Sequence, residues 1–310
     1  MRELSKKFMD DLLEPEGILH PLLTQLQKDQ TLMLAIRDGF INIYYRGGSI
    51  LKIQEQNGSS YSSFFDNRYN KSGREMPITP PSIKNQDDAK DRVTSFLVLK
   101  NIMDDYLSTY NKDEREYQQL VARENNCSSI SNESDYFISD IEVSESTSGA
   151  RFDMLAIKWQ TTKRRSGHNC RIAFIEMKYG DGALGGKAGI LKHLKDMDSL
   201  ITNKVSYVNM LHVIENQFDQ LDQLGLLKFN KGQGFSKVTL DTNVKPEVIF
   251  ILANHNPRAT LLKTILNTPE VAVYGESQHF DLKFFVASFA GYGLHAKCMY
   301  TLTEFQKFLP

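Results

Sequence analysis

The chain is poor in cysteine and tryptophan and carries almost no excess of charge. Its 310 residues include 3 Cys and 1 Trp, and 37 Lys and Arg stand against 38 Asp and Glu, for a formal net charge of -1. Because Cys127, Cys170 and Cys298 are odd in number and lack metal-ligand spacing, we expect neither a disulfide framework nor a zinc cluster. The balanced charge excludes a polybasic coat protein, but it is compatible with a nucleic-acid enzyme that has one local basic surface.

Long apolar runs are also missing from the sequence. No segment approaches the roughly 18–20 apolar residues that span a bilayer. The N-terminal MRELSKKFMDDLLEPEG has acidic residues where a signal peptide would have its apolar segment. We therefore expect a protein that is neither secreted nor associated with a membrane. The reducing cytoplasm is the simplest location for an odd number of cysteines.

Apolar residues are nevertheless sufficient for a large core, since 41% of the chain is hydrophobic and 10% is aromatic. The length favours about two domains, because domains usually have roughly 100–200 residues. Residues 1–35 are predicted to be helical, since Leu4, Phe8 and Leu12 recur at the helical period.

A β-hairpin and a loop are predicted after this helical stretch. Phe40–Tyr45 and Ile50–Ile53 resemble strands, and Gly47-Gly48 between them supplies the positive φ angles of a tight turn. Residues 57–88 are rich in Ser, Asn, Gly and Pro, which indicates a loop or boundary. We therefore assign residues 1–88 to an N-terminal accessory module of helices and a β-hairpin.

The remainder, residues 89–310, alternates between helical and strand-like patterns. The predicted elements are a helical stretch over 88–126, strands at 136–143, 151–159 and 171–179, helices from 190 to 228, a strand at 247–254, an apolar segment at 282–289 and a final helix near 303–309. From residue 111 the order is helix, three strands, helix, strand, which predicts an α/β domain with a mixed sheet. The core of this domain covers about residues 111–255.

The most informative residues lie on two neighbouring predicted strands. If residues 149–159 and 171–182 pair as an antiparallel hairpin about a turn near residue 165, Asp153 lies opposite residues 176–178. Glu176 and Lys178 project from one face, because alternate residues of a strand share a face. Two carboxylates and an ammonium are costly to bury on apolar strands, and a bound divalent cation would compensate them.

Asp153 followed by Glu176-Met177-Lys178 after a β-hairpin resembles the metal-binding signature of the PD-(D/E)XK nuclease superfamily, which has the restriction-endonuclease-like fold. The order of elements over about residues 111–255 is similar to the core of that fold. Phe152 stands where the namesake Pro of the family would be. The resemblance implies that Asp153, Glu176 and the backbone carbonyl of Met177 bind Mg²⁺ or Mn²⁺. It also implies that Lys178 positions the attacking water and offsets negative charge on the phosphate.

Many members of the family place a further glutamate on the helix before the first core strand. Glu114 is the first candidate and Glu124 the second, since both lie on the face of Tyr117 and Val121, whereas Glu116 projects to the side. An ordinary solvated helix face is the alternative for either residue.

Three other features are weaker signals. The segment 180–187 (GDGALGGK) fails the spacing of a phosphate-binding loop and is better explained as a tight strand-to-helix turn. His193, on the helix that follows, is predicted to be a packed or solvated side chain, although a position near the scissile phosphate is the alternative. The loop from Lys158 to Arg171 contains five cationic residues and no acid. It is predicted either to hold a phosphate backbone far from Asp153 or simply to aid solubility.

The leading hypothesis is a metal-dependent nuclease that hydrolyses phosphodiester bonds, in DNA ahead of RNA. The first alternative is a catalytically inactive nucleic-acid-binding or assembly module that keeps the fold. The second is an interaction protein in which Asp153 and Glu176 only form salt bridges with Lys178. The partner expected from the first two is nucleic acid, and a homo-oligomer is left open.

Overall fold

The computed structural model describes residues 2–57, 59–77, 81–144, 151–164, 166–168, 170–233, 235–256, 258–287 and 291–309. The chain divides into two compact units. The first comprises Met1–Arg123 and Asn216–Leu227, and the second comprises Glu124–Glu215 and Lys228–Pro310. The first division falls at residue 123 instead of the predicted residue 88, because the helices after residue 85 join the N-terminal sheet.

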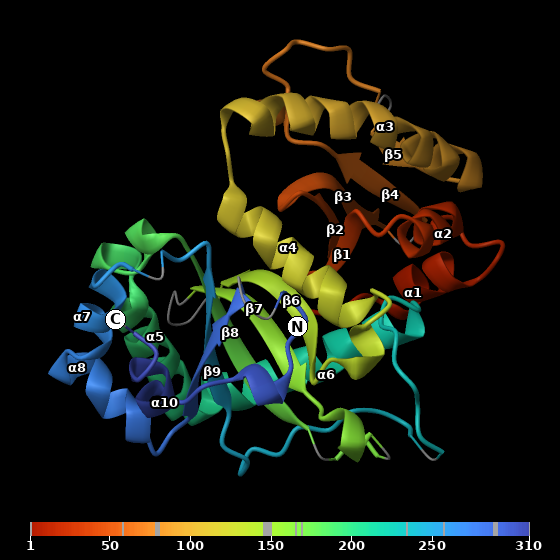
Figure 1. Ribbon diagram of the computed structural model, residues 1–310. Coiled ribbons are helices and arrows are strands. Elements are labelled where there is room, and N and C mark those ends of the chain that lie inside the picture. The colour runs from red at the N-terminus through yellow and green to blue at the C-terminus, as the bar shows by residue number, and fades with distance from the viewer. Residues whose placement is uncertain are drawn as a thin grey trace. The chain divides into compact units, whose positions relative to one another are not determined.

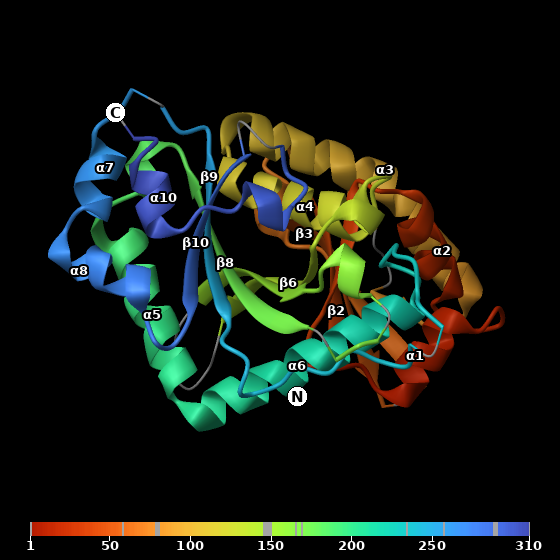
Figure 2. The ribbon, with the colours of Figure 1, turned by 60° about the horizontal axis from the view of Figure 1, so that its bottom comes forward.

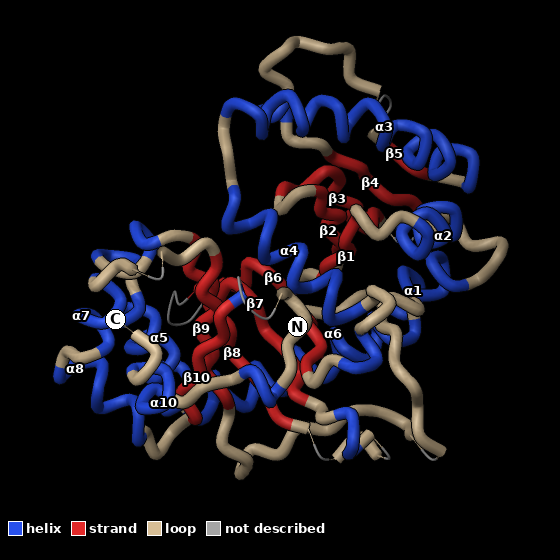
Figure 3. The backbone as a smooth tube through the Cα atoms, viewed as in Figure 1, coloured by secondary structure: helices blue, strands red, loops and turns tan. Residues whose placement is uncertain are grey.

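The first unit is built on an antiparallel sheet of five strands in the order β1-β2-β3-β4-β5, accompanied by α1, α2 and α3 (Figures 1 and 3). Its elements are α1 (Lys6–Leu13), α2 (His20–Lys28), β1 (Leu32–Ile36), β2 (Phe40–Tyr45), β3 (Gly48–Gln56), β4 (Ser60–Phe64), β5 (Ser82–Ile83) and α3 (Gln86–Thr109). Each strand pairs with the next along the chain, so the sheet is a simple meander.

Two predictions for this unit are wrong in part. The helix expected over residues 1–35 ends at Lys28, and Leu32–Ile36 is a strand that pairs with β2. A short continuous apolar run such as LMLAI does not separate a buried strand from a buried helix by its periodicity. The loop expected over 57–88 also contains β4 and β5, which the polar sequence concealed.

The predicted hairpin of β2 and β3 is confirmed, with a shift in its turn. Positive φ angles occur at Arg46 (48°) and Gly47 (73°). These two residues form the turn, as expected for the turn type that matches the strand twist. Gly48 instead begins β3, where an added Cβ would lie 2.4 Å from the Met103 side chain.

The second unit contains a mixed sheet of five strands in the order β10-β9-β8-β7-β6 (Figures 1 and 2). Its strands are β6 (Tyr136–Ser144), β7 (Arg151–Lys158), β8 (Arg171–Tyr179), β9 (Glu247–Ala253) and β10 (Asp281–Val286). β6, β7 and β8 pair antiparallel, whereas β8, β9 and β10 pair parallel. The predicted strands and the mixed sheet are therefore confirmed, and the predicted apolar segment at 282–289 supplies the edge strand, except for residues 288–290, which lie outside the described residues.

Helices α5, α7, α8 and α10 gather beside the β9–β10 side of this sheet (Figures 1 and 2). Their bounds are α5 (Ile190–Thr202), α7 (Leu261–Leu266), α8 (Pro269–Ala272) and α10 (Leu302–Gln306). Two further helices, α4 (Asp113–Asn126) and α6 (Lys204–Gln223), contribute residues to both units. The protein is thus of the α/β class. In the described ranges, no helix combines the length and the apolar character needed to cross a membrane.

Candidate active site

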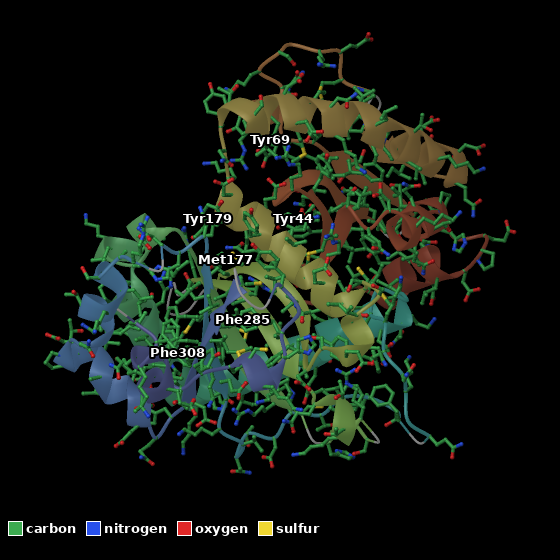
Figure 4. The ribbon with its side chains drawn as sticks, viewed as in Figure 1. Tyr44, Tyr69, Met177, Tyr179, Phe285 and Phe308 are labelled. Carbon is green, nitrogen blue, oxygen red and sulfur yellow. The ribbon has the colours of Figure 1, made fainter. Side chains whose placement is uncertain are left out.

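The hairpin of β7 and β8 has the register that the sequence predicts. Paired residues run from Lys158↔Arg171 to Met154↔Ile175. One further step sets Asp153 opposite Glu176, so their side chains leave the same face of the sheet. Lys178 shares that face, because it lies two residues beyond Glu176. Figure 4 labels Met177 and Tyr179, which flank Lys178 near the end of β8.

Glu176 and Lys178 form a buried ion pair. The Lys178 Nζ donates to Glu176 Oε1 at 2.9 Å, and each side chain is only 3% exposed. The same Nζ donates to the carbonyl of Ala188 at 2.9 Å. An ammonium group has three donors, so two of the three are used by the protein itself. The ion pair that the structural alternative requires is therefore present.

His193, predicted to be a packed or solvated side chain, is packed against this cluster. Its Nε2 lies 2.9 Å from Glu176 Oε1 and 3.2 Å from the Ala188 carbonyl oxygen. The residue lies in the first turn of α5, directly after the glycine-rich segment. That position after a tight strand-to-helix turn was the only signal in the sequence.

The loop between β8 and α5 is fixed at both ends. At its start, Asp181 Oδ1 lies 2.7 Å from Nδ1 of His255, which follows β9 and whose side chain is 8% exposed. At its end, Ala188 is held by Lys178 and His193. Positive φ angles at Gly180 (72°) and Gly186 (76°) allow the sharp turns in between. The loop therefore brings the N-terminus of α5 back to Glu176.

Two buried atoms of the cluster have no hydrogen-bond partner among the described residues: Glu176 Oε2 and His193 Nδ1. The two oxygens of Glu176 are thus unequal, since Oε1 is close to both Lys178 and His193. A buried carboxylate oxygen without a partner costs roughly 1–3 kcal/mol or more. A water or a bound cation would satisfy such an oxygen, so Glu176 Oε2 marks where a ligand of this cluster would bind.

Asp153 is half-buried and turned toward β8, where its Oδ2 accepts a hydrogen bond from the backbone N–H of Met177 at 2.8 Å. The carboxylate is therefore oriented by the strand that carries Glu176. On the other side of β7, the register of β6 sets Glu142 beside Asp153, with a positive φ of 50°. The sequence did not indicate this neighbour, because β6 is irregular between Ile138 and Asp140 and its register could not be read from the alternation of residues.

The structure brings together Asp153, Glu176 and Lys178, but it does not test the predicted helix acid. Glu114 lies on the part of α4 that belongs to the first unit, and Glu124 on the part that belongs to the second. Glu116, which was expected to project aside, is held in the first unit by Arg46 through contacts of 2.9 and 3.0 Å. The role of Glu114 and that of the Met177 carbonyl stay predictions from the resemblance.

The fit to a divalent cation can be judged from the donors. In the described part of the chain, no three or more His, Cys, Asp and Glu side chains are arranged as a ready metal cluster. The carboxylates of Asp153 and Glu176, on adjacent strands, are a smaller donor set, and one of their four oxygens, Glu176 Oε2, has no partner among the described residues. That set suits Mg²⁺, which binds through one or two carboxylates and completes its shell with waters and substrate oxygens.

Comparison with known proteins gives no further guide to this site. No family model matches the chain, and no curated protein or solved structure is significantly similar to it. The family resemblance therefore depends on Asp153, Glu176 and Lys178 and on the order of the elements that carry them.

Proposed function

We propose that the second unit is a metal-dependent nuclease of the PD-(D/E)XK type, with a restriction-endonuclease-like core, that hydrolyses phosphodiester bonds in DNA. The single observation that carries the proposal is the buried, partnerless Oε2 of Glu176 on the face that Asp153 and Lys178 share. The order α4-β6-β7-β8-α5-α6-β9 contains the helix, three strands, helix and strand that the resemblance implies, with α6 as an additional helix.

In this proposal each residue has a distinct task. Asp153 and Glu176 would hold Mg²⁺, which supplies Lewis-acid charge at the reacting phosphate. His193 and Lys178 hold Glu176 Oε1, so that Oε2 is the oxygen left for the ion. Lys178 keeps one donor beyond those given to Glu176 and Ala188. That donor would contact the attacking water or a phosphoryl oxygen and stabilise negative charge in the transition state.

A purely structural role for the cluster is the main competitor, and the ion pair of Glu176 with Lys178 favours it. Replacing a buried ion pair by apolar residues is often neutral or stabilising, so burial alone does not argue for function. An ion pair that served only stability would be expected to use both carboxylate oxygens, whereas Oε2 is left without a partner among the described residues. A catalytically inactive nucleic-acid-binding module is the other competitor.

The test combines metal binding with cleavage. The parent protein and Glu176→Gln should be titrated with Mn²⁺ by calorimetry and incubated with labelled single-stranded, duplex and branched DNA and RNA in Mg²⁺ or Mn²⁺. We expect the parent to bind Mn²⁺ and cut at least one DNA, and we expect Glu176→Gln to lose both properties. The amide keeps the shape of the side chain and removes its charge.

Asp196→Asn is the matched control, because Asp196 is a carboxylate on α5 that pairs with Lys192 at the surface. This variant should behave as the parent does. Absence of both Mn²⁺ binding and cleavage in the parent would support the structural alternative. Binding of nucleic acid without cleavage under any condition would support the inactive module.

A further inference from the structure

A groove of about 480 Å³ opens in the second unit at the end of the sheet opposite Glu176. It is formed where β7 ends and where β8, β9 and β10 begin. The charged residues that line it are Lys158, Lys163, Arg171, Lys283, Glu247 and Asp281. We call this feature the basic groove, because its four cations outnumber its two carboxylates.

The two carboxylates occupy two of the cations. Glu247, only 1% exposed, accepts hydrogen bonds from Lys158 at 2.8 Å, from the Tyr136 hydroxyl at 2.7 Å and from Arg171. Asp281 accepts from the same Arg171 nitrogen at 2.9 Å. Burial alone would lower the pKa of Arg171, but Glu247 and Asp281 outweigh it and raise that pKa, so the guanidinium stays charged. Within the groove, the two negative charges of Glu247 and Asp281 therefore balance the positive charges of Lys158 and Arg171.

The other two cations are left for a ligand. Within the described ranges neither Lys163 nor Lys283 forms an ion pair. Lys163 is exposed, and Lys283 interacts electrostatically with the exposed Glu304, whose pKa it helps to lower. Arg171 uses only Nη2 for its two acids, and its buried Nε has no partner in the same part of the chain. A guanidinium edge and two ammonium groups around one groove are donors that suit phosphate oxygens.

Not every cation of the Lys158–Arg171 loop serves this groove. Arg164 is buried and turns inward, where it donates to the carbonyls of Trp159 at 3.0 Å and Asn132 at 2.8 Å and lies 4.6 Å from the centre of the Phe137 ring. Arg165 lies outside the described residues. Cys170 supplies a neutral wall, because burial raises the pKa of its thiol to about 12. Of the described cations of this loop, Lys158, Lys163 and Arg171 therefore line the basic groove, whereas Arg164 does not.

We propose that the basic groove binds the sugar–phosphate backbone of the nucleic acid several nucleotides away from the bond that is cut. Its volume lies within the range of pockets that hold a nucleotide-sized ligand. Arg171 lies five residues before Glu176 on β8, about 17 Å at roughly 3.3 Å per residue. A duplex that rises 3.4 Å per step would cross that span in about five base pairs. This inference depends on the proposed function, since it assigns the site a long substrate.

The test measures DNA binding in the absence of cleavage. Lys163→Gln/Lys283→Gln and the parent should be compared by fluorescence anisotropy with a labelled duplex in EDTA, across a series of salt concentrations. Loss of two phosphate contacts should lower the slope of log affinity against log salt by about two and weaken binding at physiological salt roughly tenfold. The control is Lys195→Gln/Lys307→Gln, which removes two exposed lysines of the same unit and should leave the slope unchanged.

The outcomes separate this inference from the proposed nuclease activity. A weakened, less salt-dependent double variant supports the basic groove even if the parent never cuts DNA. A parent that cuts DNA while the double variant binds as the control does overturns the groove and leaves the nuclease proposal intact. A parent that binds anionic lipid vesicles through Lys163 and Lys283, but not DNA, overturns the groove as a nucleic-acid site. Equal urea midpoints for all variants would show that folding is not the cause.

Discussion

At the scale of single residues, the two carboxylate oxygens of Glu176 differ in their hydrogen-bond partners. The Glu176 side chain is only 3% exposed, so its carboxylate loses nearly all of its hydration, and that loss costs several kcal/mol unless nearby groups replace the water. Lys178 and His193 replace it at Oε1 only. Among the described residues Oε1 has two partners and the buried Oε2 has none, so the two oxygens of this carboxylate have different surroundings.

Replacement of Lys178 separates the task of binding metal from the task of catalysis. Lys178→Met keeps a long apolar stem in the buried space and removes the positive charge beside Glu176. Mn²⁺ should therefore bind at least as tightly, since both carboxylates remain and a competing cation is gone. Cleavage should nevertheless fall by about 10²–10³-fold, the usual cost of losing one group that stabilises transition-state charge.

Calorimetry with Mn²⁺ and turnover on labelled DNA measure these two effects. Lys187→Met is the matched control, because Lys187 is an exposed lysine of the same glycine-rich loop. Cleavage by Lys178→Met at the parental rate would exclude a role of Lys178 in stabilising the transition state. It would support the alternative that Lys178 only forms a salt bridge with Glu176.

Among the elements, the turn between β2 and β3 requires glycine at one position. Gly47 has a φ of +73°, and an added Cβ would lie 2.4 Å from the backbone of Arg115. Gly47→Ala should destabilise the first unit by about 3 kcal/mol or more, because the left-handed backbone costs about 1–2 kcal/mol and the steric overlap adds to it. Urea unfolding measures the loss.

Gly73 is the appropriate comparison, since it has a similar φ of +65° and no atom within 4 Å of an added Cβ. Gly73→Ala should cost only the backbone term, about 1–2 kcal/mol. Equal losses for the two variants would mean that the close approach of Arg115 contributes nothing.

The strands that could be predicted from the sequence are those whose local residue pattern favours a strand. β6, β7, β8 and β9 are apolar and β-branched, and polar or glycine-containing segments bound them. β4 contains three serines and β5 only Ser82–Ile83, so these two strands exist because neighbouring strands offer them hydrogen bonds. The local strand propensity of a segment does not predict such pairing.

The site was predictable to the same extent. The near-symmetric placement of Asp153 and Glu176 about residue 165 was sufficient to predict the register. The contact of His193 with Glu176 was not predictable, because it depends on how the loop from Gly180 to Gly189 folds through several tight turns. The alternation of residues along a strand predicts which face of the sheet each side chain occupies. It does not predict the position in space of a helix that follows an irregular loop.

On the scale of the whole molecule, residues 216–227 complete the first unit from a distant part of the chain. Gln220 clamps Leu4, accepting from its N–H and donating to its carbonyl, each at 3.0 Å. Gln217 donates to the carbonyl of Ile36 at 3.0 Å, and Asn216 donates to Glu3 at 2.9 Å. No local pattern marks this helical stretch as part of the N-terminal unit, which explains why the predicted boundary at residue 88 differs from the observed division.

Gln220→Ala should therefore weaken the first unit by about 1–3 kcal/mol, the net contribution of two hydrogen bonds. Amide hydrogen exchange in β1 and β2 would report the change directly. Gln223→Ala removes a similar side chain that donates a hydrogen bond to Asp219 on its own helix, and it should have little effect. Similar exchange rates in the two variants would mean that the clamp on Leu4 carries no stability.

The same division of α6 bears on how the chain acquires its structure during synthesis. N-terminal domains usually fold first, as soon as they leave the ribosome. Here the N-terminal sheet is complete in sequence at Ile83, but the segment that closes its unit ends at Leu227. Strands β6, β7 and β8 of the second unit have then already been made, so the first unit must wait for part of the second unit before it can finish folding.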